Sequence, residues 1–301
     1  MGLFKKRIQE QNTLFVRIWK TIVVVFLAIY CISLLVPLIW MIFTSLKDEV
    51  SYTIDNFGFP KTMVFSNYSD VLTKYLYVEQ NGFRYGLDVL FTNSLILSFG
   101  FATWGVDNIL FVAYVISRYN FIGKKFLYNL GLILMVLPIV GTLPATFKMY
   151  RIFGIYDNML MLILTSSTAP FSGMWFLIFY NSFLTIPKDF TEAAEIDGAG
   201  YYRIMFQIVM PMIIPVAAVL YVLNFISNWN NYGVCLYWLP SYPNIPYGMY
   251  VFQMGATAGS GGAGMTLIMA GFTCVMLPTV LLYIASQKIM NSNFVVGGIK
   301  M

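Results

Sequence analysis

The chain has 301 residues with a net charge of +5; 59% of them are apolar, only 10% are charged, and the mean hydropathy is +0.73. A water-facing surface needs about a quarter of its residues charged, so this composition excludes a soluble protein and predicts an integral membrane protein. The positive charges form no basic stripe and histidine is absent, which argues against nucleic-acid binding and excludes His-dependent catalysis and His-ligated metal sites.

Charge-free apolar runs locate the membrane crossings, because each crossing needs roughly 20 helical residues and charge is costly in hydrocarbon. Six apolar runs with at most one charged residue each predict an all-α, polytopic membrane protein with six transmembrane helices. The predicted spans are residues 19–43, 90–116, 127–147, 159–180, 211–233 and 265–287. An uncharged external loop, rich in proline and glycine, is expected between the last two. The first run is too long to be the apolar part of a cleavable signal peptide.

The distribution of basic residues predicts the orientation. With the N-terminus inside, lysine and arginine favour the inner segments over the outer ones by two to one. We therefore expect both termini to lie in the cytoplasm. The protein itself is expected in the cytoplasmic membrane. Residues 45–88 then form an extracellular segment, and residues 187–210 form a cytoplasmic loop.

The cytoplasmic loop has the local chemistry of a helix, a turn and a second helix. Asp189 and Glu192 have the spacing of a capping box, and Gly198 and Gly200 suit the left-handed backbone of a helix stop. The second helix is expected from Tyr201 until Pro211. Three small residues leave one side of the first helix flat enough for another protein to approach: Ala193, Ala194 and Ala199. A docking helix is predicted; the alternative is an amphipathic connector that lies on the membrane.

The spacing of this loop carries a family resemblance. Glu192-Ala193-Ala194 is followed by Gly198, by Ile208 and by Met210-Pro211. This pattern resembles the EAA signature of membrane subunits of binding-protein-dependent ABC importers, in which leucine usually stands in the place of Met210. Further stretches resemble carbohydrate importer permeases of the maltose-transporter type, so that the likeness covers most of the chain: Asn93-Ser94, residues 113–118, 121–125 and 227–232, and the tail 294–301.

The resemblance implies the ABC importer type I permease fold, as a single transmembrane domain over residues 1–301. It implies a subunit that forms half of a translocation path for sugars or oligosaccharides. The implied partners are a second homologous permease, two ABC ATPase subunits and an extracellular or periplasmic solute-binding protein. The implied ATPase-coupling residues are Glu192, Ala193, Ala194, Asp197 and Gly198. Because the sequence contains no phosphate-binding P-loop, we expect a non-catalytic chain without its own cofactor, with ATP and Mg on the partner ATPase.

Polar residues within the spans are candidates for the substrate path. Asp107 and Asn108 lie near the middle of the second span, and we expect Asp107 to face the bundle interior, either along a sugar path or in a structural polar network. A second group lies at the end of the fifth span: Asn224, Asn228, Trp229 and Asn231. Amides and an aromatic ring suit a sugar, but tryptophan is also common as an interfacial anchor.

Two alternatives to a sugar importer remain open on the sequence. The first is a secondary transporter driven by an ion gradient, with Asp107 as the proton carrier. The second is an ABC permease for a different solute, such as a polyol or glycerol phosphate. Whether transport depends on ATP distinguishes the secondary transporter from an ABC importer. Testing a panel of solutes distinguishes a sugar importer from an ABC permease for another solute.

Overall fold

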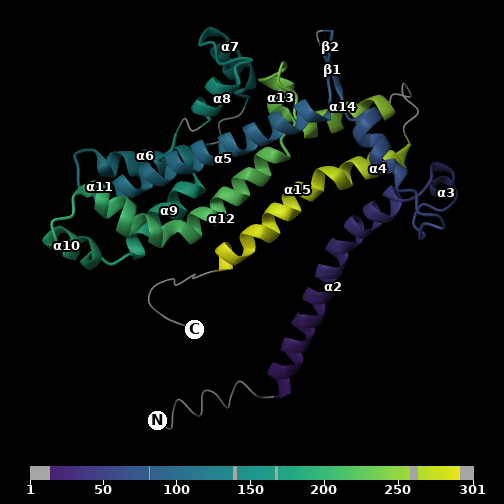
Figure 1. Ribbon diagram of the computed structural model, residues 1–301. Coiled ribbons are helices and arrows are strands. Elements are labelled where there is room, and N and C mark those ends of the chain that lie inside the picture. Colours follow the sequence, from purple (N-terminus) through teal and green to yellow (C-terminus); the bar gives the residue numbers. More distant parts are fainter. Residues whose placement is uncertain (1–13, 81, 138–140, 167–168, 258–263, 292–301) are drawn as a thin grey trace. The chain divides into compact units, whose positions relative to one another are not determined.

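The computed structural model describes residues 14–80, 82–137, 141–166, 169–257 and 264–291 (Figure 1). The chain divides into two compact units, one of residues 1–72 with 261–273 and one of residues 73–260 with 274–301. In chain order the elements are α2 (Leu14–Ser45), α3 (Glu49–Ile54), α4 (Ser66–Asp70), the π-helix η1 (Val71–Tyr75), β1 (Val78–Gln80), β2 (Phe83–Tyr85), α5 (Leu87–Arg118), α6 (Lys124–Val136), α7 (Leu143–Ile152), α8 (Met159–Thr165), α9 (Met174–Thr185), α10 (Asp189–Ile196), α11 (Tyr201–Arg203), the π-helix η2 (Ile204–Val209), α12 (Met210–Trp229), α13 (Gly233–Tyr237), α14 (Ile245–Thr257) and α15 (Met265–Asn291).

Within these described ranges, four helices are long and apolar enough to cross a membrane. They cover Val16–Ser45, Leu87–Arg118, Tyr201–Trp229 and Met265–Lys288. They match the first, second, fifth and sixth predicted spans; the first two extend beyond the prediction at both ends, whereas the fifth ends at Trp229, four residues before its predicted end. The fifth begins earlier than predicted, because α11, η2 and α12 follow one another without a break and the helix does not stop at Pro211.

The third and fourth predicted spans are not continuous helices, so the prediction of one uninterrupted helix over 127–147 and another over 159–180 was wrong. The first of these stretches divides into α6 and α7, and the second into α8 and α9. α6 ends at Val136, and the next residue, Leu137, has an extended backbone (φ −67°, ψ 117°), because the proline that follows it in the sequence disfavours a helical conformation there. α9 begins after Gly173, whose φ of +94° lies in the left-handed region.

Two segments predicted to lie outside the membrane contain regular structure. β1 and β2 form an antiparallel hairpin in which Val78 lies opposite Tyr85, a small exception to the all-α prediction. α13 and α14 lie in the segment expected to be an uncharged loop. The Asn244 side chain accepts a 3.0 Å hydrogen bond from the backbone N–H of Tyr247, and Pro246 occupies the first turn of α14, where a missing N–H costs little. The prolines therefore begin a helix here instead of preventing one.

In the unit of residues 1–72 and 261–273, polar side chains hold the segment after α2. The carboxylate of Glu49 in α3 accepts hydrogen bonds from the backbone N–H and the hydroxyl of Thr266, at 3.4 and 2.8 Å. Asn67 is buried and donates to the carbonyls of Ser45 and Lys47, at 2.8 Å each. These bonds satisfy a backbone N–H at the start of α15 and a backbone carbonyl at the end of α2. They fix the course of the segment that follows α2.

In the unit of residues 73–260 and 274–301, α5, α9 and α12 run side by side (Figure 1). Their facing side chains form one buried apolar cluster, with Val106 and Leu110 from α5, Phe179 from α9, and Ile213 and Leu220 from α12. Figure 1 shows α10 at one end of these helices and α13 at the opposite end. α5 therefore runs from one end of this unit to the other.

Asp157 joins two loops at the α13 end of this unit. It has φ of 56°, unusual for a residue with a side chain, and its N–H donates to the carbonyl of Trp238 at 2.8 Å. Its carboxylate accepts from the backbone N–H of Ser241 at 2.9 Å and from the Ser241 hydroxyl at 2.7 Å. No local pattern in the sequence indicates these hydrogen bonds, because Asp157 lies more than eighty residues before Trp238 and Ser241.

We expect Asp157→Ala to destabilise this unit by about 2 kcal/mol, because hydrogen bonds to a charged group are lost and alanine tolerates the positive φ poorly. Thermal unfolding of the purified full chain in detergent measures the change. Asp157→Asn is the matched control, since asparagine adopts this backbone more readily and keeps an oxygen for the Ser241 N–H. Equal stability of the alanine variant and the native chain would contradict this account.

Candidate functional site

The short helix α10 and the turn after it form the first candidate site. Gly198 has φ of +78°. Two backbone hydrogen bonds close the helix end: the N–H of Gly198 donates to the backbone carbonyl of Glu195 at 3.0 Å, and the N–H of Ala199 donates to the backbone carbonyl of Ala194 at 2.9 Å. The predicted left-handed stop at Gly198 is confirmed. Gly200 differs from the prediction, because its backbone is extended with φ of −72° and ψ of 163°.

The predicted capping box does not form. Lys188, not Asp189, precedes the first helical residue, and the structure gives it no side-chain capping bond. Since Asp189 already has a helical backbone, its carboxylate is not placed to accept the N–H of Glu192. Both acids still lie in the first turn, where the positive end of the helix dipole favours them.

The five predicted coupling residues do not all face outward. Glu192, Ala193, Asp197 and Gly198 are exposed, whereas Ala194 is only 7% exposed and belongs to the buried apolar cluster. Ala199 also packs against that cluster. The prediction that the alanines form one flat outer surface was therefore wrong for these two, because their small size lets α10 pack closely on its own chain.

The segment after α10 connects it to the long helices. Ile204 and Val209 of η2 are buried in the same cluster as Ala194. The rings of Phe206 and Phe111 lie 6.2 Å apart, which joins η2 to α5. The π-helix ends two residues before Pro211, whose missing N–H cannot bond the carbonyl one turn earlier. Packing thus connects α10 to both α5 and α12.

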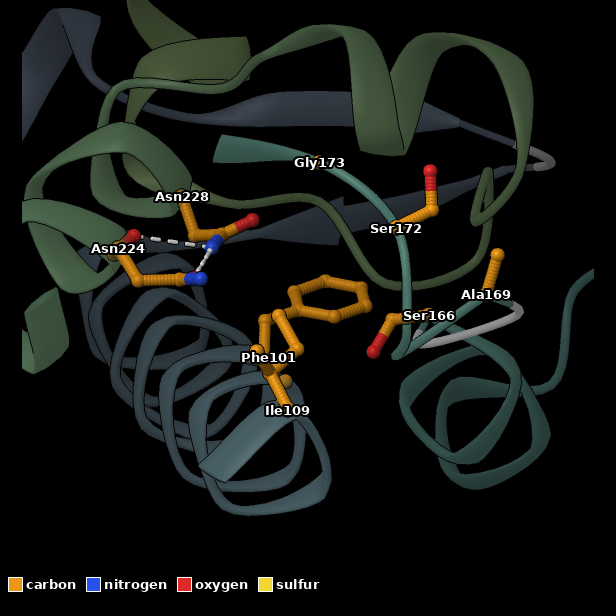
Figure 2. A pocket seen from close by; sticks show the side chains of 9 residues that line it. Phe101, Ile109, Ser166, Ala169, Ser172, Gly173, Asn224 and Asn228 are labelled. Carbon is orange, nitrogen blue, oxygen red and sulfur yellow. Dashed lines mark hydrogen bonds between the residues drawn. The ribbon is translucent and has the colours of Figure 1, made fainter. Parts of the chain in front are cut away.

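The second candidate site is a cavity of about 470 Å³ between α5, α12 and the break that separates α8 from α9. Figure 2 shows the amides of Asn224 and Asn228 on one side and the hydroxyls of Ser166 and Ser172 on another, with the ring of Phe101 beside them. The remaining lining residues are Gly105, Ile109, Ala169 and Gly173. The site thus combines amides, hydroxyls and one aromatic ring.

Hydrogen bonds orient the polar side chains of this cavity. The Asn228 amide nitrogen donates to the Asn224 side-chain oxygen and, at 2.9 Å, to the Asn224 carbonyl. The Ser172 hydroxyl donates to the carbonyl of Gly131 at 3.1 Å. A side chain at Gly131 would approach within 2.1 Å of the Phe171 carbonyl, so only glycine allows α6 to support this wall so closely.

The structure places only two of the six predicted path residues in the cavity, Asn224 and Asn228. Trp229 has an exposure of 0%, stacks on Phe225 and donates its indole N–H to the carbonyl of Val275, so its ring is a core group here. Asn231 is exposed outside the cavity, and its carbonyl accepts from Asn244 at 3.1 Å.

Asp107 and Asn108 also lie outside the cavity. Asp107 is exposed in the single chain, which contradicts the prediction that it faces the interior; the adjacent Val106 takes the buried side of α5 instead. Asn108 donates to the carbonyl of Trp104 in its own helix at 2.7 Å. The sequence analysis missed Phe101, Ser166 and Ser172, although hydroxyl residues that interrupt the fourth apolar run were an available signal.

Comparison with known proteins places this arrangement in a family. The model of the family described as "Binding-protein-dependent transport system inner membrane component" matches residues 109–295, which include α10 and both polar walls of the cavity that Asn224, Asn228, Ser166 and Ser172 form.

Curated relatives match nearly the whole chain. The diacetylchitobiose uptake system permease protein NgcG of Streptomyces coelicolor is 27% identical, over 87% of this chain and 83% of its own length. The galactooligosaccharides transport system permease protein GanQ of Bacillus subtilis is 27% identical, over 91% of this chain and 93% of its own length.

A solved structure shares the fold. A chain of a bacterial ABC transporter involved in the import of the polysaccharide alginate superposes with a TM-score of 0.73 at 22% identity, over 92% of this chain and 98% of that one. Because the family model matches more than half of the sequence, the chain belongs to the family of binding-protein-dependent transport system inner membrane components.

Proposed function

We propose that this chain is the permease subunit of an ATP-driven importer that receives a sugar or oligosaccharide from a solute-binding protein. The observation that carries the proposal is the family match over residues 109–295, which includes the short helix α10 and the turn at Gly198. In this proposal, Glu192, Ala193, Asp197 and Gly198 form the outer face that a separate ATPase holds. ATP and Mg are bound by that ATPase, and this chain transmits its movement.

The proposed substrate follows from the chemistry of the cavity and from the relatives. Amides and hydroxyls from Asn224, Asn228, Ser166 and Ser172 match the paired hydroxyl groups of a sugar, and the Phe101 ring offers an apolar face for its C–H surface. The names of the relatives refer to diacetylchitobiose and to galactooligosaccharides. We therefore propose a short oligosaccharide as the transported solute.

The break between α8 and α9 supports a water-filled path at this position. Irregular backbone at membrane depth is tolerated where it is buried in protein or lines a water-filled cavity. Ser166, Ala169, Ser172 and Gly173 belong to this break and line the cavity. In the proposed topology α6 with α7 and α8 with α9 each complete one crossing, which gives six crossings, both termini in the cytoplasm and α10 on the cytoplasmic side.

The exposed carboxylate of Asp107 supports assembly with a second permease. Trp104 and Phe111 lie one helical turn away on either side and are 39% and 38% exposed, so an apolar stripe surrounds a charged group near mid-membrane. Lipid cannot solvate such a group, whereas a facing protein surface or a path between two subunits can. The proposed assembly has two permeases, two ATPases and one binding protein.

Transport by the purified assembly in lipid vesicles tests this function. We expect uptake of labelled oligosaccharide only when ATP, Mg and the solute-loaded binding protein are supplied, with no dependence on a proton gradient. A panel of oligosaccharides, monosaccharides, polyols and glycerol phosphate identifies the solute class. Uptake driven by a proton gradient without ATP would refute the proposal and favour a secondary transporter.

A further inference from the structure

A second cavity, of about 270 Å³, lies where the end of α5 meets α10. The lining residues come from the end of α5, from α10 and its N-terminal cap, and from the segment that follows: Tyr114, Arg118, Tyr119, Lys188, Thr191, Glu192, Glu195, Tyr201 and Ile204. Charges of both signs therefore border one cavity. The proposal of an importer assigns no role to this cavity or to Arg118.

Two partly buried residues at this cavity, Arg118 and Thr191, have buried side-chain atoms without partners. The Nε and Nη2 atoms of Arg118 and the hydroxyl of Thr191 have no hydrogen-bond partner among the described residues. A guanidinium stays charged under all physiological conditions, and buried N–H donors without an acceptor are unfavourable. The cavity therefore calls for an acceptor that reaches Arg118, and a carboxylate is the strongest one available to it.

The geometry of α10 distinguishes the two carboxylates that line the cavity. Successive residues of an α-helix are rotated by about 100°, and Ala194 marks the buried side of α10. Relative to Ala194, Thr191 is rotated by about 60° and Glu195 by about 100° in the same direction, whereas Glu192 is rotated by about 160°. Both carboxylates are exposed, but Glu195 is the acid nearer the buried side of α10, one turn after the unpartnered Thr191 hydroxyl, and Glu192 lies farther from that side.

We propose that Arg118 and Glu195 form an ion pair that fills this cavity and fastens the end of α5 to α10, with Arg118 as a positioning residue. The consequence of this ion pair for transport rests on the proposed function. α5 carries Phe101, Gly105 and Ile109 of the substrate cavity and ends at Arg118, so the pair gives α10 a second connection to that cavity, beside its connection through η2 and α12. Glu192 remains free for the ATPase.

Charge reversal in the purified full chain, without ATPase or substrate, tests the pair itself. Arg118→Glu and Glu195→Arg are each expected to lower the unfolding midpoint in detergent by several degrees, and the double reversal is expected to recover most of the loss. Arg118→Glu combined with Glu192→Arg is the matched control and should not recover it. Recovery by the Glu192 combination, or by neither, would overturn the assignment. Should the reversals fail to fold, Arg118→Gln, Glu195→Gln and their combination test the pair. If the combined variant lowers the unfolding midpoint by the sum of the two single losses, the pair is overturned.

The second readout is coupling in the assembled importer. Each single reversal should reduce the amount of solute imported per ATP hydrolysed at least several-fold, and the Arg118→Glu/Glu195→Arg combination should restore it. A purely structural role would restore the unfolding midpoint without restoring this ratio, which would overturn the positioning role. Failure of the native assembly to transport with ATP would instead count against the proposed function, because the stability comparison does not depend on transport.

Discussion

Replacing Gly198 with valine is expected to leave the chain folded and inserted while reducing ATP-driven uptake at least about tenfold. Gly198 has φ of +78°, a conformation that costs a β-branched residue about 1 to 3 kcal/mol. No atom lies within 4 Å of the position that a Cβ would take, so the change acts on the backbone alone. The turn would relax to negative φ and reorient α10 relative to the ATPase. Uptake and ATP hydrolysis, measured together in vesicles, would show hydrolysis without matching import.

Gly200→Val is the matched control for this prediction. Gly200 has φ of −72°, a value that any residue adopts, and it also has open space where a Cβ would lie. Apart from a small capping effect at the start of α11, valine should be tolerated there, with uptake close to that of the native assembly. Gly198→Asn should fall between the two, because asparagine visits the left-handed region more readily than valine. Normal uptake by Gly198→Val would contradict a coupling role for this turn.

Replacing Asn228 with leucine is expected to raise the apparent KM for the transported solute about three- to tenfold. The side chain is half-buried at the cavity wall, and its bond to the Asn224 side chain orients both amides. Loss of one net hydrogen bond removes about 0.5 to 1.5 kcal/mol, and leucine also makes part of a polar wall apolar. Initial uptake rates over a range of solute concentrations measure the effect.

Asn108→Leu is the control for the cavity prediction. Asn108 donates to the carbonyl four residues earlier, as Asn228 does, at 2.7 Å compared with 2.9 Å. It lies outside the cavity, so its replacement should leave the apparent KM unchanged. A larger effect at Asn108 than at Asn228 would indicate that the solute follows another face of α5.

The fourth apolar run shows why sequence reasoning located membrane segments but misjudged their continuity. Hydropathy over residues 159–180 satisfies the requirement for one crossing, and α8 and α9 are both apolar. The break between them depends on Gly173 with its positive φ and on the support of Ser172 by the Gly131 carbonyl. Such a break is stable only because another helix and a cavity satisfy its backbone, and hydropathy does not contain that information.

Neighbouring residues in α12 show the same limit at the substrate site. Asn228 and Trp229 are adjacent, and both were candidate sugar ligands on the sequence. One lines the cavity and the other is completely buried, because a rotation of about 100° per residue places them on different sides of the helix. Asp107 and Val106 differ in the same way on α5, where the neighbouring helices cover only one of the two.

The sequence by itself determined the class of this protein, the long apolar helices and the loop that identifies its family, because hydropathy and residue spacing are local properties of the chain. Only the tertiary structure decided which polar residues share a cavity, that Ala194 packs inward while Glu192 is exposed, and that Arg118 lines a cavity beside α10 with two buried nitrogen atoms. These outcomes depend on which side of each helix its neighbours cover. That is set by packing between segments far apart in the chain, and no local pattern records it.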